Sequence, residues 1–307
     1  MNSERLNYTI GLIKESVPFL EDSIRESRRC FGEKFEQIGE DLCSVLLSLF
    51  DNDERRYIQA VKGYVKFCAE HLLLQRRLER SGHYIHDDFE KVNSEVYNNS
   101  AAMDGYYLSG LFFSTIFWPN HLRMFLFFLE VFVKGVKKYG QCCELGVGHG
   151  WLVSSLLKER DDLKAWGVDI STPALVFTEK LLSARKINKD NYSLRQYDIR
   201  SGVSCEDSAF DAVIFAEVLE HLDNPLFALR EILRILKPGG LAYITTAIFA
   251  ASIDHIYLFE SLDEAKKIIL DSGLIIKEEL VLPVYGNSRA GDRKIPVNFA
   301  CVTEKPF

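Results

Sequence analysis

The sequence predicts an α/β fold with a doubly wound, mostly parallel sheet, preceded by an all-α N-terminal domain. Up to about residue 120, apolar residues recur at helical spacing, whereas after it short apolar runs alternate with helical segments. Strands that alternate with helices imply a parallel sheet with right-handed crossovers. We therefore predict a helical substrate-recognition domain over residues 1–120 and a sheet domain over residues 121–307.

The first region contains two long helical runs. Apolar residues from Phe31 to Leu49, and again from Tyr57 to Leu72, lie three and four positions apart, which is typical of one helix face. The segment 51–53 (Asp-Asn-Asp) offers N-cap residues for the second run, and Gly82 ends it. The apolar stretch 106–118 is too short to span a bilayer, so we expect it in the core or in the wall of an apolar site.

The second region contains short apolar runs of strand length, most of them separated by helical segments. The expected strands are 141–145, 164–168, 193–197, 212–215, 241–245, 274–280 and 297–303. The expected helices are 121–138, 151–158, 173–184, 225–236 and 262–272. No helix separates the last two strands, which indicates an antiparallel pair at one sheet edge.

Composition excludes several classes of function. The net charge of −7 gives the chain no general attraction for a nucleic-acid backbone, so we expect no nucleic-acid partner. The seven cysteines include no C-x-x-C pair, which argues against a disulfide framework or a zinc site. The first residues lack a basic segment followed by an apolar one, so we expect a cytoplasmic protein that does not enter a membrane.

The segment 142–150 (CCELGVGHG) is a strand that runs through a glycine-rich turn into a helix. Two kinds of ligand compete for such a turn. A dinucleotide site uses G-x-G-x-x-G to bring a pyrophosphate to the helix N-terminus, as in a nicotinamide-dependent oxidoreductase. Here the spacing is G-x-G-x-G and Glu144 precedes it, and a carboxylate repels phosphate but suits a cation. S-adenosylmethionine, which carries a sulfonium, an ammonium group and no phosphate, is therefore favoured.

Acids also end the next two strands. Asp169, followed by Ile170, stands where a carboxylate can accept both ribose hydroxyls, with a helix N-cap as the structural alternative. Asp198 can accept from an adenine amino group while Ile199 packs on the ring, and the structural alternative is a turn aspartate. These acids complete a candidate nucleoside site.

Five motifs follow one another with characteristic spacing: ELGVGHG, GVDIS, YDIR, FDAVIFAEVLEHL and LKPGG. Together they resemble the signatures of class I (Rossmann-like) S-adenosylmethionine-dependent methyltransferases over roughly residues 140–245. The resemblance implies a seven-stranded sheet whose last strand is antiparallel, with the cofactor at the strand tips. It further implies a turn over 237–240 before the fifth strand.

The resemblance also implies roles for individual residues. Carried over, Glu144, Gly146 and Gly148 line the methionine part of the cofactor, and Asp169 holds the ribose. Asp198 and Ile199 face the adenine, and Glu217 contacts the methionine part or the substrate.

Methyl transfer requires the acceptor, the methyl group and the sulfur in line, and a base only when the acceptor loses a proton. The candidate bases are His221 after the fourth strand, His255 after the fifth, and His121 at the junction of the two regions. Asp254 would raise the basicity of His255 if the backbone bends suitably. The acids near the fourth strand show no obvious magnesium spacing, so no metal is expected.

The expected activity is methylation of oxygen, at a hydroxyl or carboxylate of a small or medium organic acceptor or a peptide terminus, as in specialised metabolite biosynthesis. The apolar run 106–113 is expected to roof the site and choose the substrate. N- or C-methylation of a small molecule, and a non-catalytic S-adenosylmethionine-binding scaffold, stay open as alternatives. A homodimer is also left open.

Overall fold

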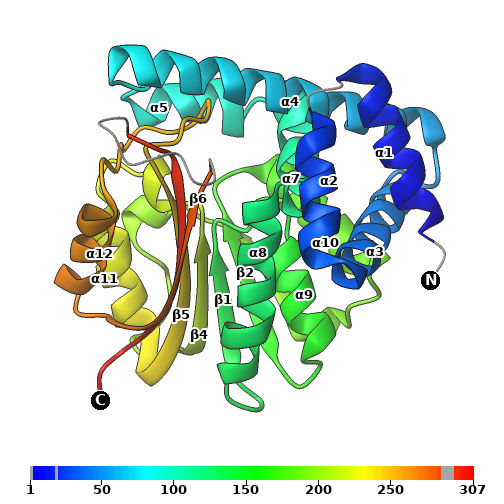
Figure 1. Cartoon of the computed structure of the whole chain (residues 1–307). Coiled ribbons are helices and arrows are strands. Elements are labelled where there is room, and N and C mark those ends of the chain that lie inside the picture. The colour runs from blue at the N-terminus through cyan, green and yellow to red at the C-terminus, as the bar shows by residue number, and fades with distance from the viewer. Residues whose placement is uncertain (1–2, 18–19, 285–293) are drawn as a thin grey trace.

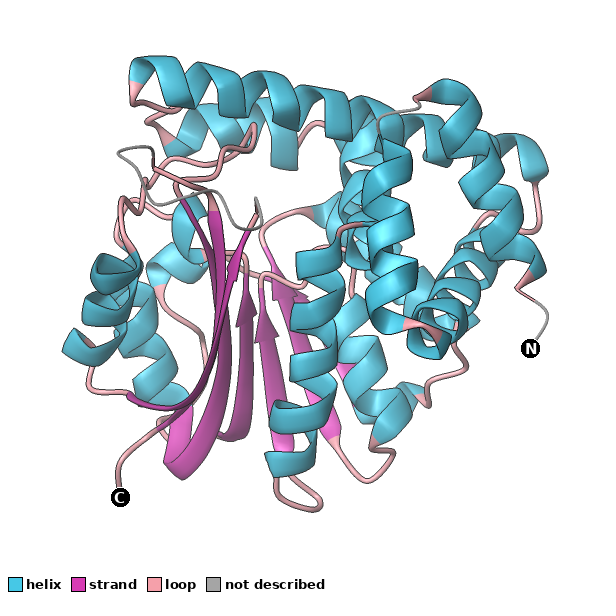
Figure 2. Ribbon diagram, viewed as in Figure 1, coloured by secondary structure: helices cyan, strands magenta, loops and turns pink. Residues whose placement is uncertain are grey.

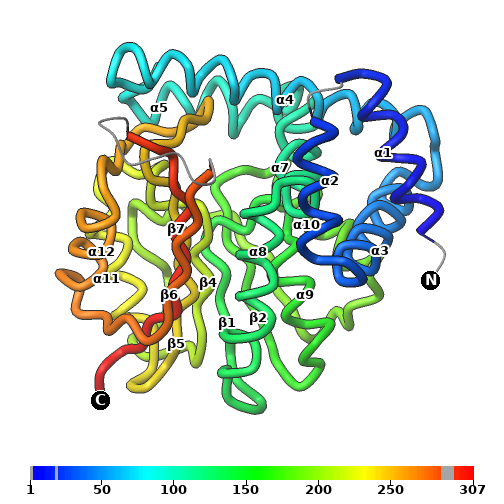
Figure 3. The backbone as a smooth tube through the Cα atoms, in the orientation of Figure 1, coloured from blue at the N-terminus to red at the C-terminus, as the bar shows by residue number. Residues whose placement is uncertain are grey.

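The computed structural model describes residues 3–17, 20–284 and 294–307 and confirms the predicted fold class. Seven strands form one sheet in the order β3-β2-β1-β4-β5-β7-β6 (Figure 2). Strands β1 to β5 pair in parallel, and β7 runs antiparallel to both β5 and β6, between which it lies (Figure 3). The strands are β1 (Gln141–Leu145), β2 (Lys164–Asp169), β3 (Tyr192–Gln196), β4 (Phe210–Ala216), β5 (Leu236–Ile248), β6 (Ile275–Pro283) and β7 (Val297–Glu304).

The order of the strands creates a crevice in the middle of the sheet. The chain begins at β1, adds β2 and β3 on one side, and then crosses over to β4 and β5 on the other. Glu144 of β1 pairs in register with Ile214 of β4, so the carboxyl ends of these two strands lie side by side. The loops that leave them diverge, and such a reversal point is where open α/β sheets bind ligands.

Helices cover both faces of the sheet (Figure 1). One face packs against α8 (Pro119–Phe127), α9 (Trp151–Glu159) and α10 (Thr172–Ala184), and the other against α11 (Pro225–Ile235) and α12 (Leu262–Asp271). The neighbouring Cys142 and Cys143 belong to the two different cores because successive strand residues face opposite sides. All seven cysteines are free.

All regular elements among the described residues of the N-terminal region are helical. The long helix α4 begins after Asp53, whose side chain accepts from the N–H of Arg55, and ends at Gly82, whose φ is +75°. It crosses above the carboxyl ends of the parallel strands (Figure 1). The region contains α1 (Glu4–Ser16), α2 (Leu20–Phe31), α3 (Glu33–Leu49), α4 (Glu54–Ser81), α5 (Phe89–Val92), α6 (Ser100–Ala102), α7 (Leu108–Phe117) and two π-helical turns, η1 (Asn93–Tyr97) and η2 (Met103–Tyr107).

The helical region and the sheet share one hydrophobic core. Leu6 of α1, Phe112 of α7 and Trp151 of α9 belong to the same buried cluster, and the ring centroids of Phe112 and Trp151 lie 5.3 Å apart. The division into two domains at residue 120 stays a prediction. No single described helix is long and apolar enough to cross a membrane; only the pair 100–117 and 119–133 passes jointly, and it is bent by 79°.

Two predicted elements differ from the structure. The helix expected over 121–138 begins at Pro119, whose ring suits the first turn, and changes to a π-helical segment, η3 (Phe128–Val133). The turn expected over 237–240 is a bulge inside β5, since Leu236 pairs with Phe210 and Leu241 pairs with Ala212. The bulge persists because Lys305 exchanges two backbone hydrogen bonds with it.

Candidate functional site

A cavity of about 290 Å³ lies at the carboxyl ends of β1, β2 and β4. One wall consists of the loops that leave these strands. The opposite wall comes from the helical region, with Phe67 and His71 of α4, Tyr107 of η2, and Leu108 and Leu111 of α7. The predicted apolar run therefore lies against the sheet crevice, and the volume is near the lower end of the range for ligand pockets.

The glycine turn forms the part of the wall next to β1. Gly146, Gly148 and Gly150 have φ angles of +78°, +52° and +73°, a region that favours glycine. The N–H groups of residues 146 and 147 both donate to the carbonyl oxygen of Val168, which fixes the turn against β2. A Cβ atom on Gly146 would lie 2.6 Å from Val218 Cγ2, so the turn has no room for a side chain there.

Glu144 lies beneath this turn and is only 4% exposed. Its Oε2 accepts a hydrogen bond of 2.8 Å from the N–H of Val153 in the first turn of α9. Burial raises the pKa of the Glu144 carboxyl well above its usual value. A positively charged ligand in the cavity would favour the charged form of the Glu144 carboxyl.

Asp169 is tied to the same turn. Its two oxygens accept 2.8 Å hydrogen bonds from the N–H groups of Gly148 and Ser171. Burial raises the pKa of the Asp169 carboxyl, although these hydrogen bonds act in the opposite direction. A carboxylate offers about four lone-pair positions, so Asp169 keeps acceptor capacity for a ligand. Ile170 lines the cavity next to it.

Asp198 and Ile199 also line the cavity. Asp198 already has a partner, because the side chain of Arg200 donates to both of its oxygens at 2.7–3.1 Å. Burial by itself raises the pKa of Asp198, but the hydrogen bonds from Arg200 lower it below its usual value. The adenine role of Asp198 and Ile199 stays a prediction. Of the three acids Glu144, Asp169 and Asp198, the last is the one that forms an ion pair with a described arginine.

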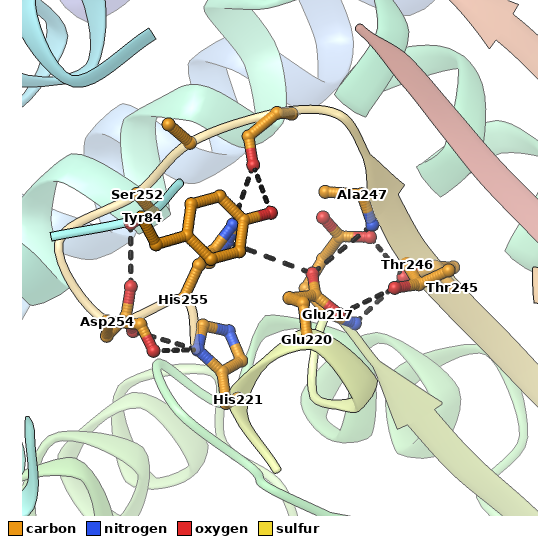
Figure 4. A network of polar contacts seen from close by, with 12 residues as sticks. Tyr84, Glu217, Glu220, His221, Thr245, Thr246, Ala247, Ser252, Asp254 and His255 are labelled. Atoms are coloured by element: carbon orange, nitrogen blue, oxygen red, sulfur yellow. Dashed lines mark hydrogen bonds and ion pairs between the residues drawn. The ribbon is translucent and has the colours of Figure 1, made fainter. Parts of the chain in front are cut away.

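Glu217 follows β4 in a strained backbone conformation, with φ at +52°. Its N–H donates to the hydroxyl oxygen of Thr245 at 2.9 Å, and that hydroxyl donates to Glu217 Oε1 at 2.6 Å (Figure 4). Burial, together with the neighbouring Glu220, raises the pKa of Glu217 to about 8. The strained residue directs a carboxyl group into the cavity wall.

Although burial has the larger and opposite effect, the charge of Asp254 raises the pKa of His255 as expected, but the side chain of Asp254 contacts His221 rather than His255. His221 Nδ1 lies 3.0 Å from the Asp254 carbonyl oxygen and 3.4 Å from its Oδ2 (Figure 4). Burial opposes protonation of His221, but Asp254 and Glu220 raise its pKa above the usual value. The hydroxyls of Tyr97 and Tyr107 also donate to Asp254.

His255 and His121 both line the cavity. His255 Nδ1 lies 2.8 Å from the carbonyl oxygen of Ala250, and burial lowers its pKa to about 3. His121 Nδ1 lies 3.0 Å from Ser114 Oγ, and burial likewise lowers its pKa to about 3. Both rings are neutral at pH 7, and their catalytic roles stay predictions.

Three residues of this network, Tyr97, Tyr107 and Glu220, were not predicted from the sequence, and neither was the contact of Asp254 with His221. Glu220 stands inside the motif FDAVIFAEVLEHL, and its 0% exposure follows from the 3₁₀ turn at Leu219–His221. The tyrosines come from π-helical turns more than a hundred positions upstream of Asp254, and no local pattern marks such a contact.

The acidic character of the cavity is its main electrostatic property. None of the described residues that line it is Lys or Arg. Its carboxylate residues are Glu144, Asp169, Asp198, Glu217 and Asp254. Such a cavity attracts cationic ligands and repels phosphate groups.

Known proteins match the sheet region. Residues 143–244 match the family described as methyltransferase domain. A probable methyltransferase of Aspergillus luteorubrus, ltbC, is 30% identical over 112 residues, which cover 34% of this chain and 39% of that protein. A ubiquinone biosynthesis O-methyltransferase of Albidiferax ferrireducens is 26% identical over 106 residues, which cover 34% of this chain and 40% of that protein. The chain thus spans about two fifths of the length of these relatives.

A solved structure extends the likeness to the fold. Phosphoethanolamine N-methyltransferase 2 of Haemonchus contortus, in complex with phosphomonomethylethanolamine and S-adenosylhomocysteine, superposes with a TM-score of 0.54 at 17% identity. The alignment covers 72% of this chain and 61% of that chain. At this identity the likeness establishes the Rossmann-like architecture and leaves the acceptor open.

Proposed function

We propose that this chain, whose residues 143–244 form a methyltransferase domain of the class I Rossmann-like kind, transfers the methyl group of S-adenosylmethionine to an acceptor oxygen. The observation that carries the proposal is the acidic cavity beside the glycine turn at the sheet's reversal point. S-adenosylmethionine brings a sulfonium and an ammonium group to these carboxylates. A nicotinamide dinucleotide would bring a pyrophosphate, which they repel.

The cofactor roles follow from the positions of the side chains. In this proposal the turn at Gly146 and Gly148, with Glu144 beneath it, receives the methionine part. Asp169 accepts the ribose hydroxyls, and Ile170 lies beside them. The adenine lies against Asp198 and Ile199. The fit rests on the buried Glu144 and the half-buried Asp169, which line the cavity and have no Lys or Arg ion-pair partner among the described residues.

The reaction itself is an in-line displacement. A lone pair of the acceptor oxygen forms a bond to the methyl carbon while the carbon–sulfur bond breaks, and its electron pair stays on sulfur as S-adenosylhomocysteine. The chain has to align the two molecules and exclude water, which the aromatic wall from α4, η2 and α7 supports. A hydroxyl acceptor also releases a proton, for which the imidazole rings of His221, His255 and His121 are the candidate acceptors.

The acceptor in this proposal is a small or medium organic molecule or a peptide terminus. Oxygen as the methylated atom is supported by the name of the Albidiferax relative, whereas the Haemonchus protein is named as an N-methyltransferase. A cavity of about 290 Å³ between two packed regions suits a compact group rather than a duplex. N-methylation of a small molecule is therefore the second candidate.

Calorimetry on the full chain is the first test. We expect one S-adenosylhomocysteine to bind per chain and no detectable binding of NADH; the reverse order would overturn the proposal. Trideuteromethyl S-adenosylmethionine is then incubated with fractionated extracts, and labelled products are identified by mass spectrometry. Saponification distinguishes methyl esters from ethers and N-methyl groups. Labelled nucleic acid would contradict the proposal, and binding without any labelled product would favour the scaffold alternative.

A further inference from the structure

One end of the cavity carries two carboxylates and two imidazoles that the cofactor proposal does not fully use. Glu217, Glu220 and His221 follow β4, and His255 comes from the loop after β5 (Figure 4). One carboxylate oxygen of Glu220 and one nitrogen of each imidazole lie within 4.8 Å of one another. We propose that Glu217, Glu220, His221 and His255, together called the Glu220 cluster, bind a divalent metal cation beside the acceptor.

The two histidines have the tautomer that a metal needs. His221 Nδ1 and His255 Nδ1 each point at a backbone carbonyl oxygen, of Asp254 and Ala250, at 3.0 and 2.8 Å. A carbonyl oxygen only accepts, so the proton is on Nδ1 and the lone pair is on Nε2. Metal-binding histidines are held in the same way, by donating their other N–H to a carbonyl or carboxylate.

No described Lys or Arg forms an ion pair with Glu217 or Glu220, so the charged forms of these two carboxyl groups lack a compensating cation. Glu220 is 0% exposed and accepts from Thr246 Oγ1 at 2.8 Å and from the N–H of Ala247 at 3.3 Å. These neutral donors hold the side chain in place but do not compensate a buried charge. Glu217 lies on the same wall, held through one oxygen by Thr245. A divalent cation would compensate both carboxylates.

Asp254 acts behind the cluster as a positioning residue. It is 1% exposed and holds His221, while Ser252 Oγ donates to it at 2.6 Å and two tyrosines donate from the helical region. This chain of hydrogen bonds orients the His221 ring. It also connects the Glu220 cluster to the cavity wall that the helical region forms, through Tyr97 and Tyr107.

Imidazole with carboxylate is the donor set of Zn²⁺, Fe²⁺, Co²⁺ and Mn²⁺ rather than of Ca²⁺. Ligand atoms about 2.1 Å from a tetrahedral cation are about 3.4 Å apart, so the side chains have to close inward by up to about 1.4 Å on binding. Glu217, His221 and His255 line the cavity and Glu220 lies behind them, which leaves the cavity side of the cation open. If the proposed function holds, the acceptor oxygen takes this position and loses its proton more readily.

The test uses the full chain after treatment with a chelator. Calorimetric titrations with Mn²⁺, Co²⁺ and Zn²⁺ chlorides, one at a time, are expected to show one site per chain with a dissociation constant of about 10 µM or tighter. Pulsed electron paramagnetic resonance of the Mn²⁺ form is expected to show coupling to imidazole nitrogen. The variants Glu220→Gln and His255→Asn are expected to weaken binding by at least about 30-fold.

His86→Asn is the matched control, since His86 is buried outside the cavity beside Glu95 and its replacement is expected to leave metal affinity unchanged. No saturable binding of any of the three ions would overturn the inference, as would unchanged affinity in both cluster variants or the absence of nitrogen coupling. S-adenosylhomocysteine affinity is measured in parallel. Wild-type protein that does not bind S-adenosylhomocysteine would refute the proposed function. Wild-type protein that binds S-adenosylhomocysteine but no metal ion would refute this inference alone.

Discussion

Replacement of Asp169 by Asn separates the charge of this side chain from its shape. The carboxylate already accepts from Gly148 and Ser171, and the remaining lone pairs are assigned to the ribose hydroxyls. A hydrogen bond to a charged group contributes roughly 1.5–3 kcal/mol. Asp169→Asn is therefore expected to weaken S-adenosylhomocysteine binding about 10- to 150-fold in calorimetric titrations.

The same substitution also disturbs the protein, and this effect is measured separately. Asn has one acceptor oxygen, so one of the two backbone N–H groups loses its partner at a cost of roughly 1–3 kcal/mol in stability. Thermal unfolding without ligand reports that cost. Asp190→Asn, at an exposed position of the 3₁₀ turn η4 (Lys189–Asn191), is the control and is expected to bind normally. A folded Asp169→Asn protein whose affinity stays within about twofold of wild type would refute the ribose assignment.

Three further predictions concern the glycine turn, His149 and the interface between the two regions. Gly146→Ala places a Cβ atom 2.6 Å from Val218 Cγ2 at a positive φ. Urea unfolding should therefore show a free energy of unfolding about 1–3 kcal/mol lower, and calorimetry should show a loss of cofactor binding. Normal cofactor binding would contradict the role proposed for the turn. Burial lowers the pKa of His149 to about 4, so the unfolded state takes up the proton first as pH falls below about 6.5. Stability should fall from there to about pH 4 by up to about 1.4 kcal/mol per pH unit for this group, and urea unfolding of His149→Asn should show a correspondingly smaller slope than wild type. Asp41→Asn removes the negative charge 3.0 Å from the buried Arg185 guanidinium and should cost about 1–2 kcal/mol in the same assay; unchanged stability would contradict a stabilising role of this ion pair.

Local patterns predicted the sheet because most of its parallel strands contain short apolar runs, and Gly146 follows β1 while Asp169 ends β2. Glu144, Asp169 and Asp198 could be placed near the strand ends for the same reason. Once the end of a strand is predicted, the position of the acid beside that end is known as well. The bulge in β5 could not be predicted, because Gly239 takes its partner from Lys305 at the far end of the chain.

The polar network was beyond local patterns as well. Asp254 stands next to His255 in sequence, but its carboxylate turns to His221 because Tyr97, Tyr107 and Ser252 hold it there. Those donors come from the helical region and from the loop itself. Only the packing of the helical region over the strand ends brings them together, so the direction of the Asp254 side chain depends on tertiary structure.

The continuous interior that joins α1, α7 and α9 has a consequence for how a substrate enters. A lid that is fused to the core in this way does not swing open as a rigid body, because separation would bring Phe112 and Trp151 into water together. The π-helical turns η1 and η2 are short segments of the helical region that line the cavity with Tyr97 and Tyr107, the tyrosines that donate to Asp254. If the proposed function holds, we expect substrate entry to depend on movements of such short segments. If the proposed function holds, the acceptor is better changed through single side chains on those turns, because exchanging the whole helical region would remove part of the shared hydrophobic core.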